Sequence, residues 1–498
     1  MNSLNLTPPL LLGVLIFYFL LLYLISRYTS ENATNLDFFN GSKKSPWFVV
    51  AFGMVGASLS GVTFISIPGW VHNTSFSYIQ MVMGYSIGYL IIMKVLLPMY
   101  YKRNLISIYG YLNQRFGRYS HKTGAVFFIL SRIIGASFRL YLVTMILHDF
   151  IFSYYGMPYW LSVFISLALI WSYTVKAGIK TIIWTDTLQT FFMIVAIIIA
   201  IISIASSLQI DFTNILIEIK KHEYSQVFFF DGGWSDKNNF FKQFLAGALI
   251  ALVMTGLDQD MMQKNLSCKT LGESQKNIRW FYVVLVLVNI LIMALGVLLY
   301  MYAKHKGVEL PVNTEGKIIT DKVFPIIALN HLPVYLGVVF LIGLLAAAYS
   351  SADSALTSLT TSYCVDIKEE INTQKVTRMK IHLSFTLILF LTIVLFKYSM
   401  HASVISGLFT LAGYTYGPLL GLFAFGMINK RRIQDKYVPY IAVFAPVITF
   451  FINKNSQDLF AGYQFGFELL LINGLLMFLG LLLISIKPFL NQKQEKTI

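Results

Sequence analysis

A hydroxyl-rich segment inside an apolar stretch offers the clearest chemistry in this sequence. Residues 346–358 read AAAYSSADSALTS, with five hydroxyl side chains within nine positions. On a helix, one face of this segment carries positions 347, 350, 351, 354 and 358. Close packing explains the alanines and single serines, because small residues line the contacts between membrane helices. A cation stripped of water needs about five or six oxygen ligands, so the same face predicts a cation site.

Two acidic residues lie in or beside apolar stretches. Asp353 lies within the hydroxyl-rich segment, and a carboxylate deep in a membrane helix costs about 2.5–3.5 kcal/mol on insertion scales and is commonly functional. Asp186, in the sequence WTDTLQ, lies near the expected end of another span, where it could cap the helix or reach water. If the two carboxylates meet, a cation or a proton must lie between them, because like charges repel.

Arg139 lies near the middle of an expected membrane span. The side chains of Lys94 and Arg132 start closer to span ends and could reach the interface, whereas Arg139 is too central. Its charge needs an anionic partner, and there are two candidates. One is Asp258, in a structural ion pair, and the other is a carboxylate on a bound solute, held in the two-pronged manner that arginine favours.

Membrane helices must position these residues. The chain is 56% hydrophobic and 12% charged, whereas about a quarter of a soluble protein is charged, and its apolar runs have the ~20 residues needed to cross a bilayer. The first run lacks the features of a cleaved signal, so we expect a retained helix. Thirteen spans are predicted: 9–27, 46–71, 77–100, 123–153, 158–175, 181–207, 241–258, 278–303, 334–364, 381–400, 402–428, 437–453 and 466–487.

The charge distribution predicts the topology. With the N-terminus outside, the inside segments and helix ends hold 25 Lys and Arg residues and the outside ones hold 10, as the positive-inside rule requires. Lys264 and the C-terminal Lys487, Lys493 and Lys496 are counted inside. The net charge of +15 therefore indicates a membrane surface and not a nucleic acid. Two cysteines, Cys268 and Cys364, make neither a metal site nor an expected disulfide.

The spans divide into two sets of five. Span two contains candidate helix breakers at 58–61 and at Pro68-Gly69, and span seven contains them at Gly247 and at 255–256. Secondary transporters often consist of two inverted halves whose binding sites lie at such broken helices. The predicted organisation of the single membrane domain, 1–498, is an extra helix and loop at 1–45, a first repeat at 46–207, a second repeat at 241–428 and C-terminal helices at 429–498. The outside loops 208–240 and 304–333 suggest short surface helices.

Ordered motifs along the chain resemble those of the sodium:solute symporter family in a bacterial member. They are the segments GASLSGVTF at 56–64, RFG at 115–117, WTD at 184–186 with Gln189, DQD at 258–260 with Gln263 and Lys264, the Ser350-Ser351 segment, and GYTYGP at 413–418. The resemblance implies an all-α integral membrane fold of the leucine-transporter type, a five-plus-five inverted repeat with additional peripheral helices. Sodium is the implied coupling ion, and no other cofactor is expected.

The resemblance also implies site residues. The main sodium site would use the carbonyl groups of Gly56, Leu59 and Ala347 and the side chains of Ser350 and Ser351. A second cation site, similar to that of sialic acid transporters, would use Asp186, Ser350, Asp353 and Ser354. This sequence departs from the pattern there, because Asp353 stands where a hydroxyl is expected, so a sodium or a proton remains open. Ser60, Thr63 and Arg139 fall where sialic acid transporters contact their substrate, the arginine taking its carboxylate.

The expected function is sodium-coupled uptake of a small solute by alternating access. An organic anion such as sialic acid or another carboxylate is favoured, and a sugar, amino acid or polyol carried with sodium or protons is the alternative. A substrate sensor or a membrane-embedded enzyme is the alternative from another class, although no phosphate loop, nucleophile elbow or zinc pattern is present. We expect a multi-pass protein of the bacterial inner membrane, with its C-terminus in the cytoplasm and no obligate protein partner.

Overall fold

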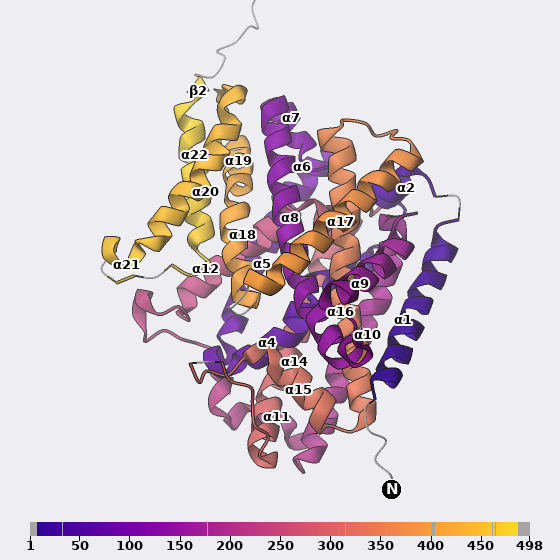
Figure 1. Ribbon diagram of the computed structural model, residues 1–498. Helices are drawn as coiled ribbons and strands as arrows, with labels where there is room; N and C mark the ends of the chain where they lie inside the picture. The colour runs from indigo at the N-terminus through magenta and orange to yellow at the C-terminus, as the bar shows by residue number, and fades with distance from the viewer. Residues whose placement is uncertain are drawn as a thin grey trace, which may run out of the picture.

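Helices make up nearly all of the protein (Figure 1). The computed structural model describes residues 7–486 except 32, 177, 314, 400–403, 461 and 464. Helix α1 (Pro8–Thr29) begins toward the lower end of Figure 1, and strands β1 (Arg432–Ile433) and β2 (Ser485–Ile486) pair antiparallel at the upper end. These ends are called the lower and upper faces. The first residues of the predicted eleventh span, 402 and 403, and Lys487, Lys493 and Lys496 lie outside the described residues.

Each predicted span coincides with a helix or a pair of helices. After α1 these are α3 (Trp47–Ser58) with α4 (Gly61–Thr74), α5 (Tyr78–Ile91) with α6 (Leu97–Lys102), α8 (Arg118–Leu147), α9 (Tyr159–Thr174), α10 (Ile179–Ser207), α12 (Phe240–Ala251) with α13 (Gln259–Asn265), α14 (Leu271–Lys306), α16 (Val334–Ser362), α17 (Lys375–Ser399), α18 (Val404–Thr415) with α19 (Gly417–Ile428), α20 (Val438–Lys454) and α22 (Leu469–Leu483). Shorter helices are α2 (Asn35–Asn40), α7 (Gly110–Arg115), α11 (Ile215–Lys221), α15 (Thr320–Ile326) and α21 (Ser456–Leu459). Two of them, α11 and α15, lie in the predicted outside loops.

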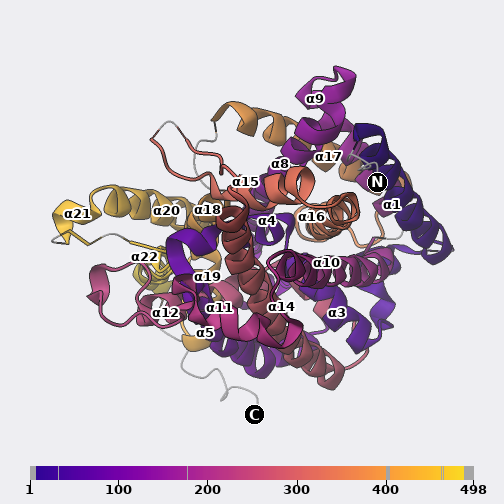
Figure 2. The same ribbon diagram turned by 90° about the horizontal axis from the view of Figure 1, so that it is seen from below.

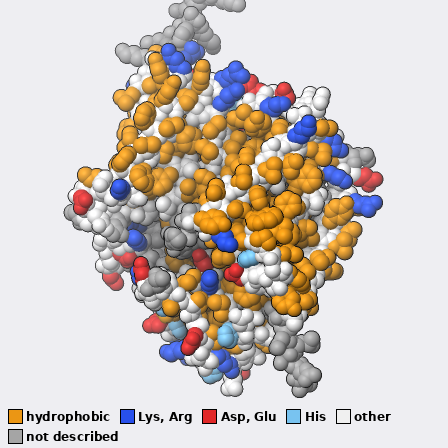
Figure 3. Space-filling model, viewed as in Figure 1, with side chains coloured by type: hydrophobic (Ala, Val, Ile, Leu, Met, Phe, Trp, Pro, Cys, Tyr) orange, Lys and Arg blue, Asp and Glu red, His pale blue; other side chains and the backbone are white. Residues whose placement is uncertain are grey.

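The outer surface is suited to lipid. Among the described residues, 8 helices are long and apolar enough to cross a membrane, or 10 when each of two bent pairs counts as one span. Large apolar side chains such as Phe17, Phe191 and Leu391 are exposed, and Figure 3 shows an almost continuous apolar surface between charged ends. A hydrocarbon environment requires every backbone polar group to be satisfied internally, which continuous helices achieve. The protein is therefore a multi-pass membrane protein.

Two of the spans built from paired helices are broken at residues with non-helical backbone angles. The first break separates α3 from α4 at Leu59 and Ser60, as the sequence predicted. The second lies at Leu257 and Asp258, where the helix axis bends by 68° between the α12 segment and α13. The predicted end of this span at residue 258 was wrong, because the span continues to Asn265. Its charged second half stays buried since its charges are paired inside the protein, which hydropathy does not detect.

One half of the first interrupted span, α4, lies at the centre of the molecule. Seen from the lower face, α4, α10, α14 and α16 form the middle, with α1 and α9 on one flank and α20 to α22 on the other (Figure 2). The hydroxyl-rich segment of α16 is fully buried there. This arrangement agrees with the predicted fold class, a central helical unit with additional peripheral helices.

Candidate functional site

The first break exposes the end of α3 to α16. Leu59, with φ −84° and ψ 80°, ends the helix, and the last carbonyl groups of a helix have no partner within it. The Val55 carbonyl accepts the N–H of Leu59. The Ala57 carbonyl accepts the hydroxyl of Ser351 at 3.3 Å. The end of α3 therefore lies against the hydroxyl face of α16.

Ser350 lies at the same contact. Its hydroxyl is fully buried and has no hydrogen-bond partner among the described residues, and such a group costs about 1–3 kcal/mol unless something binds it. An added Cβ at Gly56 would lie 3.5 Å from Ser350 Oγ and would overlap Thr190 Oγ1, so glycine permits this close approach of helices. The structure thus brings Gly56 together with Ser350 and Ser351. Leu59 stands at the break, and Ala347 is buried one turn earlier on α16.

Asp186 lies in the interior and does not cap α10. The helix begins at Ile179, and the Asp186 side chain is fully buried, so of the two possibilities left open by the sequence, a cap or contact with water does not hold. Its Oδ2 lies 2.7 Å from Nζ of Lys264 and accepts the hydroxyl of Ser354 at 3.4 Å. When the side-chain amide of Gln189 is oriented so that both its oxygen and its nitrogen form hydrogen bonds, the nitrogen donates to Asp186 Oδ1 at 3.3 Å.

Asp353 lies in the same polar cluster. Its Oδ2 accepts the hydroxyl of Tyr173 at 3.0 Å, and its Oδ1 accepts the N–H of Ser354 at 2.6 Å. Electrostatic interactions link Asp353 to both Asp186 and Lys264. The predicted second-site residues Asp186, Asp353 and Ser354 therefore do come together, and a lysine that the sequence analysis counted at a cytoplasmic helix end lies among them.

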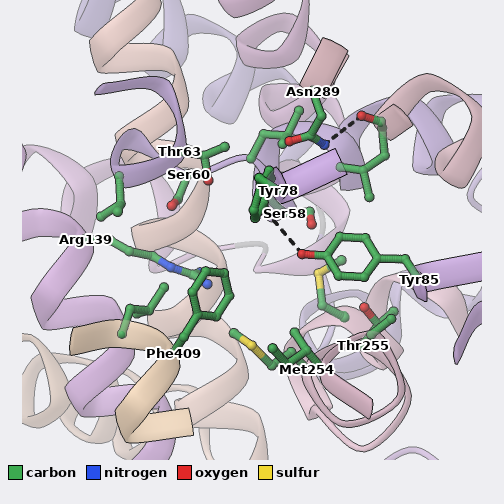
Figure 4. A pocket seen from close by; sticks show the side chains of 18 of the residues that line it. Ser58, Ser60, Thr63, Tyr78, Tyr85, Arg139, Met254, Thr255, Asn289 and Phe409 are labelled. Carbon is green, nitrogen blue, oxygen red and sulfur yellow. Dashed lines mark hydrogen bonds between the residues drawn. The ribbon is translucent and has the colours of Figure 1, made fainter. Parts of the chain in front are cut away.

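Arg139 lines a cavity between the broken helices. Ser60 and Thr63 lie on its side of this cavity, while Tyr85, Met254 and Thr255 lie across from it (Figure 4). Arg139 is 7% exposed. Among the described residues, no carboxylate pairs with it, and its Nε has no hydrogen-bond partner. All three predicted substrate residues thus share one cavity, at which a buried cation is left without an anion.

Of the two partners left open for Arg139, Asp258 forms no ion pair with it among the described residues. Asp258 instead lies 3.6 Å from Nη2 of Arg132 and accepts the hydroxyl of Tyr416 at 2.5 Å. A close ion pair joins Arg132 to Asp260. The expectation that Arg132 reaches the interface was therefore also wrong, since Arg132 is 4% exposed. These two carboxylates form ion pairs with Arg132, and among the described residues neither forms one with Arg139.

Comparison with known proteins identifies the family. The model of the sodium:solute symporter family matches residues 38–435. The chain belongs to the sodium:solute symporter family. This symporter is accordingly a transporter and not an enzyme, and its family couples the movement of a small solute to sodium.

Named relatives carry sodium with acids. The symporter is 24% identical to the sodium/sialic acid symporter NanT of Aliivibrio fischeri, over 85% of this chain and 83% of that one. It is 24% identical to the sodium/sialic acid symporter SiaT of Proteus mirabilis, over 90% of each chain. It is also 24% identical to the human sodium-coupled monocarboxylate transporter 2, over 80% of this chain and 64% of that protein.

Solved structures agree on the fold. A sodium-coupled sialic acid symporter, solved in a substrate-bound outward-open state, superposes with a TM-score of 0.78 at 19% identity, covering 95% of this symporter and 97% of that chain. Mhp1, a nucleobase-cation-symport-1 family transporter, superposes with a TM-score of 0.52 at 13% identity, covering 89% and 92%. These neighbours establish the predicted leucine-transporter-like fold class.

Several residues of the site escaped sequence analysis. The cavity includes the aromatic side chains of Tyr78, Tyr89 and Phe409, which read as ordinary membrane residues. The pairing of Lys264 with Asp186 joins positions 78 residues apart, and no local pattern reports it. The one available signal was composition, because residues 258–264 carry three charges beside an apolar run.

Proposed function

We propose that this symporter takes up a small organic anion, such as a sialic acid or another carboxylate, together with sodium by alternating access. The observation that carries this proposal is Arg139, a buried guanidinium without a carboxylate partner among the described residues, in the cavity that Ser60 and Thr63 also line. A buried charge without a counterion is strongly unfavourable. A carboxylate on the solute would neutralise it through two parallel hydrogen bonds.

Names of relatives support an acidic solute. Sialic acid and monocarboxylates both carry a carboxylate, and the relatives named for them match most of this chain. The aromatic wall of the cavity would contact the rest of the solute. A neutral sugar, amino acid or polyol remains the alternative, and it would leave the charge of Arg139 without a counterion.

The main sodium site consists, in this proposal, of the carbonyl groups of Gly56, Leu59 and Ala347 and the side chains of Ser350 and Ser351. Its support is the unpaired Ser350 hydroxyl and the contact of Ser351 with the broken end of α3. Sodium bound there would hold α3 against α16 next to the substrate cavity, which explains how ion binding organises the solute site. Asp186, Asp353 and Ser354 form the proposed second cation site.

We further propose that the lower face is external and the upper face cytoplasmic, in a bacterial inner membrane. This places the N-terminus outside and the C-terminus inside. Support comes from the excess of Lys and Arg at one set of helix ends. At the upper face, Arg118 forms an ion pair with Glu369, which holds the pKa of Glu369 below its usual value.

The test is uptake into proteoliposomes under a sodium gradient, with a panel of carboxylates and their neutral amides. We expect sodium-dependent uptake of at least one acid and not of its amide. Arg139→Gln should reduce this uptake at least 100-fold, and Arg139→Lys should restore part of it, because lysine keeps the charge but not the two-pronged geometry. Uptake of every acid at the wild-type rate by Arg139→Gln would contradict the proposal. A neutral solute that the wild type and Arg139→Gln transport equally well would favour the alternative.

A further inference from the structure

The cavity that Arg139 lines contains a second buried polar group with an unused atom. Asn289, on α14, also lines this cavity and is 1% exposed. Its side-chain nitrogen donates to the carbonyl oxygen of Leu285 at 2.8 Å (Figure 4). Its side-chain oxygen, Oδ1, is buried and has no hydrogen-bond partner among the described residues. The cavity therefore holds an acceptor that no described protein group satisfies.

The neighbouring backbone fixes the orientation of this amide. A backbone carbonyl group only accepts hydrogen bonds, so the nitrogen of Asn289 must face Leu285. Exchanging the two amide atoms would set one acceptor oxygen against another and would remove the hydrogen bond at 2.8 Å. Asn289 thus offers the cavity an acceptor and not a donor.

A solute that occupies the cavity must replace the water that this oxygen would otherwise bind. Affinity falls when the replacing group cannot reproduce the hydrogen bond of the water. A site built to hydrogen-bond one solute group also rejects an analogue without that group, because its own polar atom is left unpaired. Asn289 Oδ1 therefore selects for a donor on the solute.

The other polar groups of the cavity restrict the solute less. The hydroxyl groups of Ser60 and Thr63 can donate or accept, whereas the Arg139 guanidinium only donates and Asn289 Oδ1 only accepts. Figure 4 shows Arg139 and Asn289, from α8 and α14, at separate places around the cavity. One solute would therefore present two different groups to them, an anion and a hydrogen-bond donor.

We propose that Asn289 is a specificity-determining residue, whose side-chain oxygen accepts a hydrogen bond from a hydroxyl or N–H group of the solute while Arg139 binds its carboxylate. The substrate class is then an acid with a second hydrogen-bond donor, such as a hydroxy acid or an N-acylated sugar acid, in preference to a plain aliphatic monocarboxylate. This inference rests on the proposed function, because it presumes that Arg139 binds a carboxylate.

The experiment titrates the thermal stability of the purified full-length protein, in saturating sodium, with five acids. Two pairs differ only in one hydroxyl group: lactate with propionate, and 3-hydroxybutyrate with butyrate. The fifth acid is N-acetylneuraminate, a sialic acid. In wild type, a hydroxylated acid should give half-maximal stabilisation at a concentration about tenfold or more below that of its plain partner, because only the hydroxyl satisfies Asn289.

Asn289→Leu should remove this preference, since it replaces the amide with an apolar side chain of similar size. It should weaken the binding of the hydroxylated acids and of N-acetylneuraminate about tenfold or more and leave the plain acids unaffected. Asn277→Leu is the matched control. Asn277 lies on the same helix, is buried and also has an unpaired Oδ1, but it does not line the cavity. This control should keep the wild-type preference, whatever its effect on stability.

Three results would overturn the inference. They are plain acids that bind wild type as tightly as their hydroxylated partners, Asn289→Leu that binds every acid as wild type does, and an equal loss of preference in Asn277→Leu. The paired acids test wild type directly, so the inference stays falsifiable if Asn289→Leu does not fold. Stabilisation of wild type by none of the five acids would instead contradict the proposed function itself.

Discussion

Three buried cations in the membrane-spanning part differ in their partners. Arg132 pairs with Asp260 and lies near Asp258, whereas Lys264 pairs with Asp186. Arg139 has no such partner among the described residues. Sequence analysis singled out Arg139 because it is central in its span, but it assigned Arg132 and Lys264 to helix ends. Hydropathy reports how far a charge lies from the end of a span, and it carries no information on a partner more than 70 positions away.

The Arg132 pair should stabilise the second break. Asp258 caps α13 by accepting the N–H groups of Asp260 and Met261, and Arg132 holds both acids. Arg132→Met should destabilise the protein by about 3–5 kcal/mol, because it leaves buried carboxylates uncompensated. Thermal unfolding in detergent measures this loss. The double variant Arg132→Met with Asp260→Asn should recover part of the stability, and a double variant as unstable as the single one would contradict the assigned pair.

At the scale of elements, the broken helices were only partly predictable. The break at Leu59 was read from a run of small and hydroxyl residues, and the structure confirms it. The second break was expected at Gly247 or at Thr255-Gly256. It lies at Leu257 and Asp258, and the predicted span stopped before α13. The helices that coincide with the predicted spans were predictable because lipid selects long apolar runs, and among the described residues 8 to 10 of them have the length and composition of a full span. The 68° bend depends on buried charge pairs between distant helices, and sequence spacing does not encode it.

Close packing of α5 and α12 gives a test at this scale. An added Cβ at Gly247 would overlap the carbonyl oxygen of Met81, which is backbone and cannot rotate away. Gly247→Ala should therefore separate the two helices and destabilise the protein by about 1–3 kcal/mol, as measured by thermal unfolding. Gly272→Ala is the matched control, since a Cβ there meets nothing within 4 Å. Equal stabilities of the two variants would contradict this packing.

For the whole molecule, sodium stoichiometry decides what transport can achieve. One sodium carried with a monovalent anion moves no net charge, so membrane voltage contributes nothing. A tenfold sodium gradient, worth ~1.4 kcal/mol, then supports about tenfold accumulation at any voltage. With two sodium ions, ~100 mV would add ~2.3 kcal/mol for the net charge moved and raise accumulation to roughly several thousandfold.

If the main sodium site alone is coupled to transport, uptake of a monovalent anion is independent of voltage. Proteoliposomes with a fixed tenfold sodium gradient and a potassium-diffusion potential allow the comparison. Steady-state accumulation of a transported monovalent acid should be about tenfold at zero and at about −100 mV alike. Strong voltage dependence in wild type would show that a second sodium ion moves with the anion, while leaving the anion site intact.

The most direct test of the account is sodium-dependent thermal stability of the purified protein in potassium buffer. A ligand that binds only the folded state stabilises it by about 2.7 kcal/mol at one hundred times its dissociation constant. The account predicts saturable stabilisation by sodium, and a shift of that titration to at least tenfold higher sodium in Ser351→Ala, which removes one proposed ligand. No response to sodium in wild type, or an identical titration in Ser351→Ala, would contradict sodium binding at the break between α3 and α4.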